Sequence, residues 1–348
     1  MLDIVRLDLF DSDFLAAFDR LYAEASRAGR KFATPWPLPE RLASWQTPST
    51  VRRYEGWLAV DEGEVVGVAE VELPLLDNTH LGLAAVYVPA GLQRRGIGSA
   101  LADHVLMRLR DDGRRVVQAF IASDQVDPAG SDSGPPSSGE AFATAYGLTN
   151  RLVNAHQVLE LPVPDDRLRR LAVGAASHHS DYRFDAWSDP CPDQHVAAYC
   201  RLKSAMLDQA PMGDLVYEPE VWDEERLREG EAELAAMGRT RYVQVAIASD
   251  ETMVGHTELV VPRHDPHDVF QWDTLVLPEH RGHRLGLALK VANHVLVQSD
   301  HPDRRRAHTW NAAGNAPMVA VNDALGYRRV ELVGEWQGPV PTLSLIHI

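Results

Sequence analysis

The sequence has few cysteines, no long apolar run and a shortage of positive charge. Among 348 residues there are only two cysteines, Cys191 and Cys200, too few for a disulfide framework and at a spacing that matches no metal-ligand signature. No apolar stretch reaches the roughly 20 residues that a bilayer-spanning helix needs. The formal net charge of −16 disfavours nucleic acid phosphates and anionic lipid. We therefore expect no metal, no nucleic acid and no membrane partner, whereas a cationic small molecule suits this charge.

The first residues, "MLDIVRLDLFDSDF", also lack the basic cluster and the unbroken apolar segment of a secretory signal, so we expect a cytoplasmic protein. The hydrophobic fraction of 45% and the charged fraction of 24% are those of a globular chain. A chain of this length favours two compact units, each with its own core.

An internal repeat supports two units. The stretch "VVGVAEVELP" matches "MVGHTELVVP" much later in the chain, so that Gly67 and Glu70 correspond to Gly255 and Glu258. Each copy is followed by an alternating apolar segment that ends in proline, "LAAVYVP" or "DTLVLP", and then by a glycine-bearing stretch, "QRRGIGSAL" or "RGHRLGLAL". The same order of segments in both halves indicates one architecture built twice.

Hydrophobic periodicity predicts the same element order in each half: a strand, helices, three strands, a helix, a strand, a helix and further strands. The fold class is thus α/β (α+β), with two tandem domains, each a mixed central sheet flanked by helices. We place the first domain at residues 1–164, a linker at 165–181 and the second domain at 182–348. The Gly-, Ser- and Pro-rich segment 123–139 reads as a mobile loop, and the final "LSLIHI" has no counterpart in the repeat and is given no function.

The glycine-bearing stretch of the first half is suited to a phosphate group. A helix start leaves backbone N–H groups unpaired at the positive end of its dipole, and Gly96 and Gly98 allow a ligand to approach them closely. Gln93, Arg94 and Arg95 add donors and positive charge. The stretch has neither the Gly-Lys-Ser/Thr of a Walker loop nor the third glycine of a dinucleotide fingerprint.

With the preceding strand and the following apolar helix, this stretch resembles the acyl-CoA-binding core of the GNAT superfamily of N-acetyltransferases. The two-domain layout is similar to tandem members of the mycothiol synthase type. The resemblance implies acetyl-CoA as the cofactor and assigns it, in the first half, Val86, Val88, Gln93, Arg94, Arg95, Gly96, Ile97, Gly98 and Ser99. In the second half it assigns Leu275, Val276, Arg281, Gly282, His283, Arg284, Leu285 and Gly286. Arg284 replaces the first glycine there, so it either clashes with CoA or offers a guanidinium to a phosphate.

A second stretch of the later half carries amides at helical spacing. Asn311, Asn315, Met318 and Asn322 lie at offsets of four, seven and eleven, which gathers them on one helical face. Amides are costly in a dry core, so we expect this face to meet a polar ligand. The stretch resembles the second cofactor motif of the superfamily, in which Asn315 would contact the pantetheine arm. The counterpart in the first half has Ala143 where many members have tyrosine, so we expect the chemistry in the second half.

Acetylation of an amine needs a base, because an amine of pKa about 10.4 is neutral in only about one molecule in 2,500 at pH 7. We expect Glu258 to be that base, with Asp273 as the second choice and an outward-facing strand carboxylate as the alternative reading. Tyr327 is one candidate acid for the departing thiolate and Tyr217 another, whereas packing at a strand start is the other reading for Tyr327. A thiolate also leaves without an acid, since thiols ionise near about pH 8.5.

We expect the acceptor to be chosen by the acidic loop "LDQAPMGDLVYEPEVWDEE", through Asp208, Asp214, Tyr217 and Glu218, unless the loop is only a solvated surface. The sequence thus predicts an acetyltransferase for a primary amine of a small cationic molecule, such as an aminoglycoside or a capreomycin-type antibiotic, acting as a monomer or homodimer. Two alternatives stay open: a biosynthetic step like that of mycothiol synthase, and a CoA-binding sensor without turnover.

Overall fold

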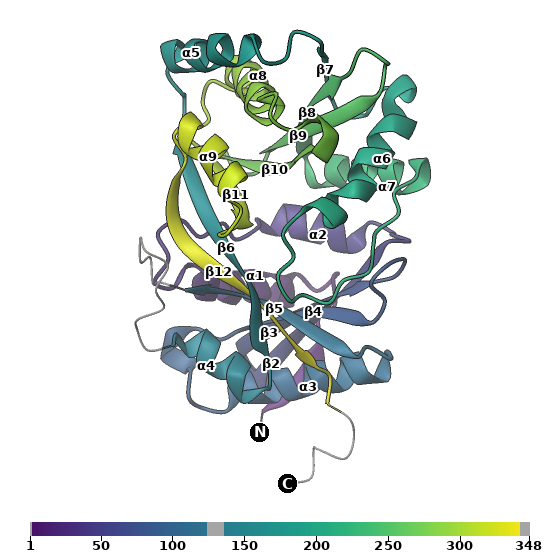
Figure 1. The fold of residues 1–348 in the computed structure, drawn as a ribbon. Coiled ribbons are helices and arrows are strands. Elements are labelled where there is room, and N and C mark those ends of the chain that lie inside the picture. The colour runs from purple at the N-terminus through teal and green to yellow at the C-terminus, as the bar shows by residue number, and fades with distance from the viewer. Residues whose placement is uncertain (1, 124–135, 342–348) are drawn as a thin grey trace. The chain divides into compact units, whose positions relative to one another are not determined.

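The computed structural model describes residues 2–123 and 136–341. Most of the segment predicted as a loop, at 124–135, and the final "LSLIHI" lie outside the described residues. Contacts between residues divide the chain into two units (Figure 1). Unit 1 takes the described parts of Met1–Val153, Gly213–Glu218 and Leu332–Ile348, and unit 2 takes Asn154–Met212 and Pro219–Glu331.

Unit 1 is a mixed sheet with helices beside it. Its elements are β1 (Asp3–Arg6), α1 (Ser12–Arg27), α2 (Leu38–Gln46), β2 (Arg52–Asp61), β3 (Glu64–Pro74), β4 (Leu81–Tyr87), a 3-10 turn η1 (Ala90–Leu92), α3 (Ile97–Asp111), β5 (Val116–Ser123) and α4 (Ser138–Ala145). Two further strands, β6 (Thr149–Glu160) and β12 (Arg328–Pro339), are divided between the units. The strand order is β1-β2-β3-β4-β5-β12, antiparallel except for the parallel pair of β4 and β5.

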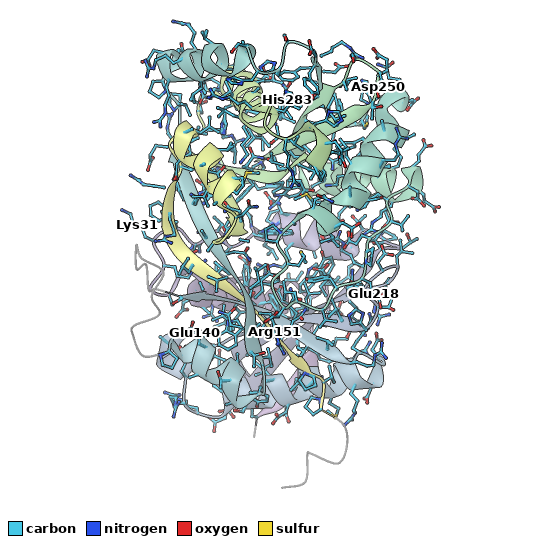
Figure 2. All side chains as sticks on the ribbon, in the orientation of Figure 1. Lys31, Glu140, Arg151, Glu218, Asp250 and His283 are labelled. Atoms are coloured by element: carbon cyan, nitrogen blue, oxygen red, sulfur yellow. The ribbon has the colours of Figure 1, made fainter. Side chains whose placement is uncertain are left out.

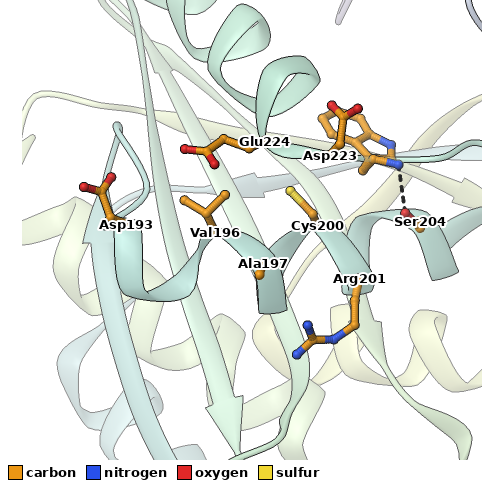
Figure 3. Close-up of a pocket in the computed structure, with 9 residues that line it drawn as sticks. Asp193, Val196, Ala197, Cys200, Arg201, Ser204, Asp223 and Glu224 are labelled. Atoms are coloured by element: carbon orange, nitrogen blue, oxygen red, sulfur yellow. Dashed lines mark hydrogen bonds between the residues drawn. The ribbon is translucent and has the colours of Figure 1, made fainter.

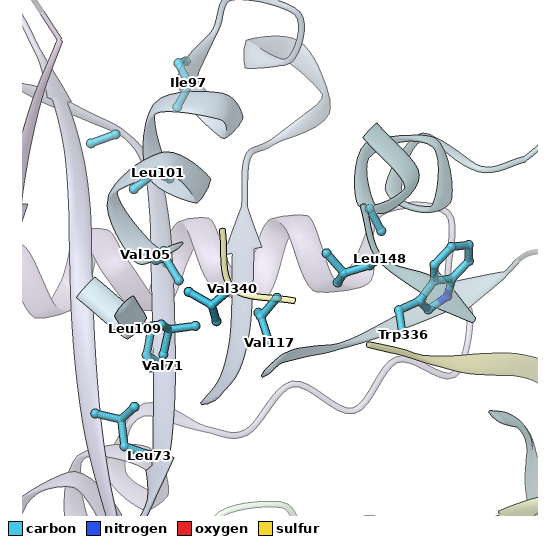
Figure 4. Close-up of a cluster of buried hydrophobic side chains, with 13 residues drawn as sticks. Val71, Leu73, Ile97, Leu101, Val105, Leu109, Val117, Leu148, Trp336 and Val340 are labelled. Atoms are coloured by element: carbon cyan, nitrogen blue, oxygen red, sulfur yellow. The ribbon is translucent and has the colours of Figure 1, made fainter. Parts of the chain in front are cut away.

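Local chemistry explains where the helices of unit 1 begin. The Asp11 carboxylate caps α1 by accepting the N–H groups of Asp13 and Phe14 at 3.0 Å. Ser137 and Glu140 form a reciprocal capping box at the start of α4. The core between α3 and the sheet contains Leu101, Leu109 and their neighbours (Figure 4), and it also includes Trp336 and Val340 from the end of the chain. Each fully buried apolar side chain of this kind contributes about 1.5–3 kcal/mol.

Unit 2 is also a mixed sheet with helices beside it. Its elements are α5 (Asp165–Ala176), β7 (Arg183–Ser188), α6 (Asp193–Gln209), α7 (Glu224–Met237), β8 (Arg239–Ile247), β9 (Met253–Pro262), β10 (Asp268–Val276), a 3-10 turn η2 (Pro278–His280), α8 (Leu285–Asp300), β11 (Arg306–Ala312) and α9 (Ala316–Leu325). The strand order is β6-β11-β10-β9-β8-β7, with β10 and β11 parallel. The predicted fold class, a mixed sheet flanked by helices in each half, is confirmed.

The structure differs from the expected domain limits at four places, one of which is Gly213–Glu218, expected in the second domain but grouped with unit 1. Residues 165–176, which we expected in a linker, form helix α5, whose Leu168 and Ala175 are buried. Residues 154–164 group with unit 2 by contacts. The last described residues, from Leu332, group with unit 1, because Leu332–Pro339 pairs antiparallel with β5.

Candidate functional site

In unit 1 the two parallel strands, β4 and β5, are paired over a short stretch and then separate. Pairing between β4 and β5 is confined to Leu81–Leu83 and Val116–Gln118. Beyond Leu83, β4 continues to Tyr87 along β3 alone. Backbone groups of β4 that point toward β5 in this part are therefore left without a strand partner, and such an edge can hydrogen-bond an extended ligand.

The glycine loop follows directly and opens helix α3. Gly96 is the N-cap residue with φ +81°, a left-handed conformation that favours glycine, and no side chain caps the helix. A Cβ placed on Gly96 would meet no protein atom within 4 Å. The first N–H groups of α3 are thus accessible to an anion, and the loop fits a diphosphate.

The other predicted loop residues surround these amides. The side chains of Gln93, Arg94, Arg95 and Ser99 are exposed, and Gln93 donates to the carbonyl of Val88 at 3.1 Å. Val86, Val88 and Ile97 pack into the core beneath the loop. A Cβ on Gly98 would make only ordinary contacts, 3.7 Å or more from Phe142 and Val88, so packing within the protein leaves room for a larger residue there. From α4, Tyr146 donates to the carbonyl of Ser99 at 3.2 Å.

A cavity of about 270 Å³ lies where β4 leaves β5. It is lined by Tyr22, Trp36, Arg41, Trp45, Tyr54, Glu70, Val71, Glu72, Leu83, Ala84, Ala85, Tyr87 and Phe120. Glu70 on β3 accepts a hydrogen bond from the Tyr87 hydroxyl at 2.8 Å. Burial raises the pKa of Glu70, against the opposing influence of Arg41. A carboxylate with a raised pKa beside a cavity is suited to take a proton.

The matching carboxylate of unit 2, Glu258, lies in the opposite environment. It is fully buried, accepts the Tyr199 hydroxyl at 2.6 Å, and binds the Lys203 ammonium at 3.0 Å. Lys203 in turn contacts Asp273 at 2.5 Å. Burial alone raises the pKa of Glu258, but the positive charge of Lys203 and hydrogen bonding with His256 hold it well below the usual range. Our alternative reading of Glu258 as an outward-facing carboxylate is therefore incorrect, and the low pKa makes it a weak base.

Side chains of the glycine loop of unit 2 form hydrogen bonds with backbone carbonyl groups of the same unit. Gly282 and Arg284 have φ of +89° and +54°. The Arg284 guanidinium donates to the carbonyl of Gly174 at 2.9 Å, and His283 contacts the carbonyl of His178 at 3.0 Å. Arg281 donates to the carbonyl of Val276 at 3.1 Å. These contacts give the expected phosphate-binding cations partners within unit 2.

The side chains near this loop pack tightly. Leu275 and Leu285 are buried in the core of unit 2. A Cβ on Gly286 would lie 3.9 Å from Val276 and would meet no clash.

The expected single helical face of amides is wrong, because α9 begins at Ala316: Asn311 lies on strand β11 and Asn315 is the N-cap residue of α9. The amide side chains also have partners within the protein. Asn315 caps α9 by accepting the N–H of Met318 at 3.3 Å. Asn322 is fully buried, donates to Gln157 and Asn311, and accepts from Lys290 at 2.6 Å. The expected polar ligand is therefore unnecessary to satisfy Asn322.

Burial shifts the pKa values of two groups near α9, Lys290 and Tyr327. Burial lowers the pKa of Lys290 to about 7. Tyr327 is buried in the core and contacts His294 at 3.2 Å, and burial raises its pKa. This environment matches the packing role that we gave as the other reading for Tyr327 and opposes use as an acid.

The four residues expected to choose the acceptor fall in different units. Asp208 belongs to α6 of unit 2, whereas Asp214, Tyr217 and Glu218 belong to unit 1. Figure 2 labels Glu218. The backbone N–H of Glu218 donates to Asn78 at 2.6 Å, and its carboxylate lies 3.4 Å from His80. The acidic loop therefore does not form one cluster within either unit.

Unit 2 has a hollow of about 450 Å³ between α6 and α7. Asp193, Arg201 and Glu224 line it together with Cys200 (Figure 3), and the N–H of Trp222 donates to Ser204 at 2.9 Å. Neither Glu258 nor Asp273 lines this hollow. Within the described residues no group of three metal-binding side chains occurs, and none of the described helices is long and apolar enough to span a bilayer.

The residues that surround Glu70 and Glu258 and influence their pKa values were not identified from the sequence. Arg41, Tyr22 and Tyr87 beside Glu70 come from α2, α1 and β4, and Lys203 beside Glu258 comes from α6. None of these residues forms a short sequence motif with the repeated glutamate. The only available signal was the recurrence of glutamate at positions 70 and 258.

Comparisons with known proteins show similarity to acetyltransferases of the GNAT type. The model of the acetyltransferase (GNAT) family matches residues 17–129, which include Glu70 and the loop at Gly96. A tandem GNAT protein from the clavulanic acid biosynthesis pathway, in a structure without acetyl-CoA, is 27% identical, with a TM-score of 0.79 over 98% of this chain and 99% of that chain. A GCN5-related N-acetyltransferase from Sphaerobacter thermophilus is 13% identical, with a TM-score of 0.65 over 98% and 96%, and shows likeness in fold alone. No curated protein sequence matches the chain.

Proposed function

We propose that the chain is a tandem acetyltransferase of the GNAT type and that its unit 1 transfers an acetyl group from acetyl-CoA to a primary amine of a small molecule. One observation carries the choice of unit 1. Glu70, with its raised pKa, lines a cavity at the point where β4 leaves β5, and the open N-terminus of α3 follows on the same strand-to-helix connection.

Different residues of unit 1 would bind different parts of acetyl-CoA. The N–H groups at the start of α3, with Gln93, Arg94 and Arg95, would hold the diphosphate of CoA. The unpaired edge of β4 beyond Leu83 would bind the amides of the pantetheine arm and orient the thioester carbonyl. Acetyl-CoA, when bound, supplies the activated acetyl group.

Glu70 removes the proton that blocks attack. An ammonium group has no lone pair, so the carboxylate takes a proton from it, directly or through a water molecule. The amine nitrogen then forms the new N–C bond and the C–S bond breaks, with its electron pair on the departing sulfur. The second proton of the nitrogen passes to this thiolate or to water, and no protein acid is needed because thiols ionise near about pH 8.5. The Tyr87 hydroxyl donates to Glu70 and fixes the orientation of its carboxylate.

The proposed chemistry moves from the second half of the chain, where we expected it, to the first. Glu258 and Asp273 are both bonded to Lys203, so use of either as a base would first require that the ion pairs break. The cavity of about 270 Å³ is slightly smaller than ligand pockets of about 300–1,000 Å³. This size favours an acceptor smaller than an aminoglycoside or a capreomycin-type peptide.

A thiol-release assay with acetyl-CoA and a panel of small amines tests the proposal. We expect release above background with at least one amine, and a loss of about 10²- to 10⁴-fold in kcat for Glu70→Gln. The matched control is Glu64→Gln, an exposed carboxylate on the same strand, which should keep the rate. Absence of release with every amine would refute the enzyme, and an active Glu70→Gln variant would refute the base.

A further inference from the structure

The cavity of unit 1 contains a buried cation whose bonding is incomplete. Arg41 on α2 is 4% exposed and lines the cavity. One terminal nitrogen, Nη2, donates to the carbonyl of Trp36 at 3.2 Å, but Nη1 has no hydrogen-bond partner among the described residues. A buried guanidinium normally has all of its N–H groups paired, and an open one is costly.

The surroundings of Arg41 fix the guanidinium without neutralising it. The group lies over the ring of Tyr22, 3.3 Å from the ring centre, and 5.4 Å from the ring centre of Phe18. In the part of the chain that the structure describes, no carboxylate forms an ion pair with Arg41. The positive charge is therefore rigidly placed and is available to an anion from outside the protein.

A carboxylate of opposite charge lines the same cavity but is bonded elsewhere. Glu70 accepts from Tyr87, and Arg41 acts on Glu70 only through its electric field. The cavity thus presents a cation and an anion that are close enough to influence each other and that form no direct pair. A small molecule that carries both an amine and a carboxylate complements both groups at once.

We infer that the acceptor of unit 1 is an amino carboxylate, an amino acid or a molecule of similar size, whose carboxylate pairs with Arg41 while its amine faces Glu70. This inference rests on the proposed function, since it names the substrate class of the same site. The pairing has a chemical advantage: the carboxylate is bound by Arg41 and leaves Glu70 available for the amine proton. Acetylation removes the positive charge of the amine, so the product loses its attraction to Glu70 and leaves more easily.

The walls of the cavity indicate the rest of the acceptor. Trp36, Trp45, Tyr54 and Phe120 contribute aromatic surface, and Trp36 and Phe120 are 38% and 54% exposed. Exposed aromatic rings around a small cavity favour an apolar or planar body on the ligand. We therefore expect phenylalanine, tryptophan and leucine to be better acceptors than glycine or lysine.

The test compares acceptors that differ only in the carboxylate. Wild-type enzyme is titrated calorimetrically, with CoA present, with L-phenylalanine, L-phenylalaninamide and phenethylamine, and with the tryptophan and leucine counterparts. We expect at least one amino acid to bind about tenfold or more tightly than its amide and its decarboxylated amine. Equal or tighter binding of the uncharged counterparts in every series would overturn the inference, and this readout needs no turnover.

Variants of Arg41 provide the second arm. Arg41→Lys keeps the charge but loses the planar fork, so we expect the KM for the amino acid to rise about tenfold or more, with little change in kcat/KM for phenethylamine. Arg20→Lys on α1, an exposed arginine, is the control and should change neither constant. Equal losses for both acceptors would show that Arg41 only supports the cavity.

The two proposals fail in distinguishable ways. If an amine without a carboxylate is acetylated and the amino acids are not, the proposed function stands and the inference falls. If the amino acids bind selectively and no amine causes thiol release, the binding of an amino carboxylate at Arg41 stands, whereas its role as acceptor and the proposed function fall.

Discussion

At the scale of single residues, the glutamate that recurs in the repeat lies in two different environments. Glu70 lies beside a cavity and has a raised pKa, whereas Glu258 lies in a network of charges and has a lowered one. The sequence revealed that the two positions correspond, because the strand motif recurs. It did not reveal their environments, since Tyr87, Lys203 and Tyr199 come from other elements.

If Glu70 is the base, as we propose, the acidic limb of the pH profile of kcat reports the ionisation of Glu70. Because the base must be ionised, kcat rises with pH through a pKa above the usual glutamate value of about 4.3. The Tyr87 hydroxyl favours the ionised form by donating to it, so Tyr87→Phe should move this limb to higher pH. Tyr54→Phe, in a tyrosine that lines the same cavity but does not bond Glu70, should leave the limb in place. An unchanged limb in Tyr87→Phe would contradict this reading.

Glu258 should matter to stability more than to acetyl transfer. Glu258→Gln leaves the buried Lys203 with one carboxylate fewer, and loss of one partner of a buried pair costs about 3–5 kcal/mol. Because the pKa of Glu258 is lowered on folding, its contribution is present above about pH 4.3 and is lost as pH falls through the folded-state pKa. Thermal midpoints of wild type and variant should therefore differ at neutral pH and converge in acid.

The surface carboxylate Glu251, which pairs with Arg183 at 2.7 Å, provides the control for that experiment. Glu251→Gln should shift the midpoint little at any pH, because exposed ion pairs contribute little. A Glu258→Gln variant that is as stable as wild type at neutral pH would rule out the buried network as a structural element.

At the scale of elements, the strand, turn and helix around Gly96 are the part of the site that the sequence predicted best. The left-handed φ, the open helix start and the exposed loop residues all follow from the glycine spacing. The parting of β4 from β5 was not predictable, because alternation of apolar residues continues along β4 past the last paired residue. Helix α5 had a readable signal, since Leu168, Leu171 and Ala175 recur at helical spacing after Pro164.

Substitutions in the glycine loops test which loop binds CoA. Gly96→Ala places a Cβ where no protein atom lies within 4 Å, so the fold should lose only about 1–2 kcal/mol from the left-handed backbone. The KM for acetyl-CoA should nevertheless rise about tenfold or more, because the Cβ would occupy the open space in which we propose that the diphosphate binds. Gly91→Ala and Gly286→Ala, which introduce no clash, should leave this KM unchanged. If Gly286→Ala alone weakened acetyl-CoA binding, the site would belong to unit 2.

At the scale of the whole molecule, the division into units does not follow the order of the sequence, since residues from the end of the chain belong to unit 1. Leu332–Pro339 pairs with β5, and Trp336 lies in the core of unit 1 although it comes from the end of the chain. Local periodicity predicted a strand there, but pairing between distant segments leaves no local pattern. The sequence therefore predicted two copies of one fold and could not assign their exchanged strands.

Trp336→Ala should loosen the first unit and spare the second. Loss of a buried tryptophan costs about 3–5 kcal/mol, so amide hydrogen exchange should accelerate in β5 at Val116–Ser123 and remain slow in β9 and β10. Trp272→Ala on β10, where the side chain is 36% exposed, is the matched control and should leave β5 protected. Faster exchange in β9 and β10 of Trp336→Ala would contradict the assignment.

We propose that one fold is present twice and that, of the two corresponding glutamates, Glu70 is suited to remove a proton and Glu258 is not. A ¹³C NMR titration of the glutamate side-chain carboxyls, assigned with Glu70→Gln and Glu258→Gln, measures both groups in one sample. We predict that Glu70 titrates above about 4.3 and that Glu258 stays ionised well below it. A Glu70 that titrates below that value, or a Glu258 that titrates above it, would contradict the account.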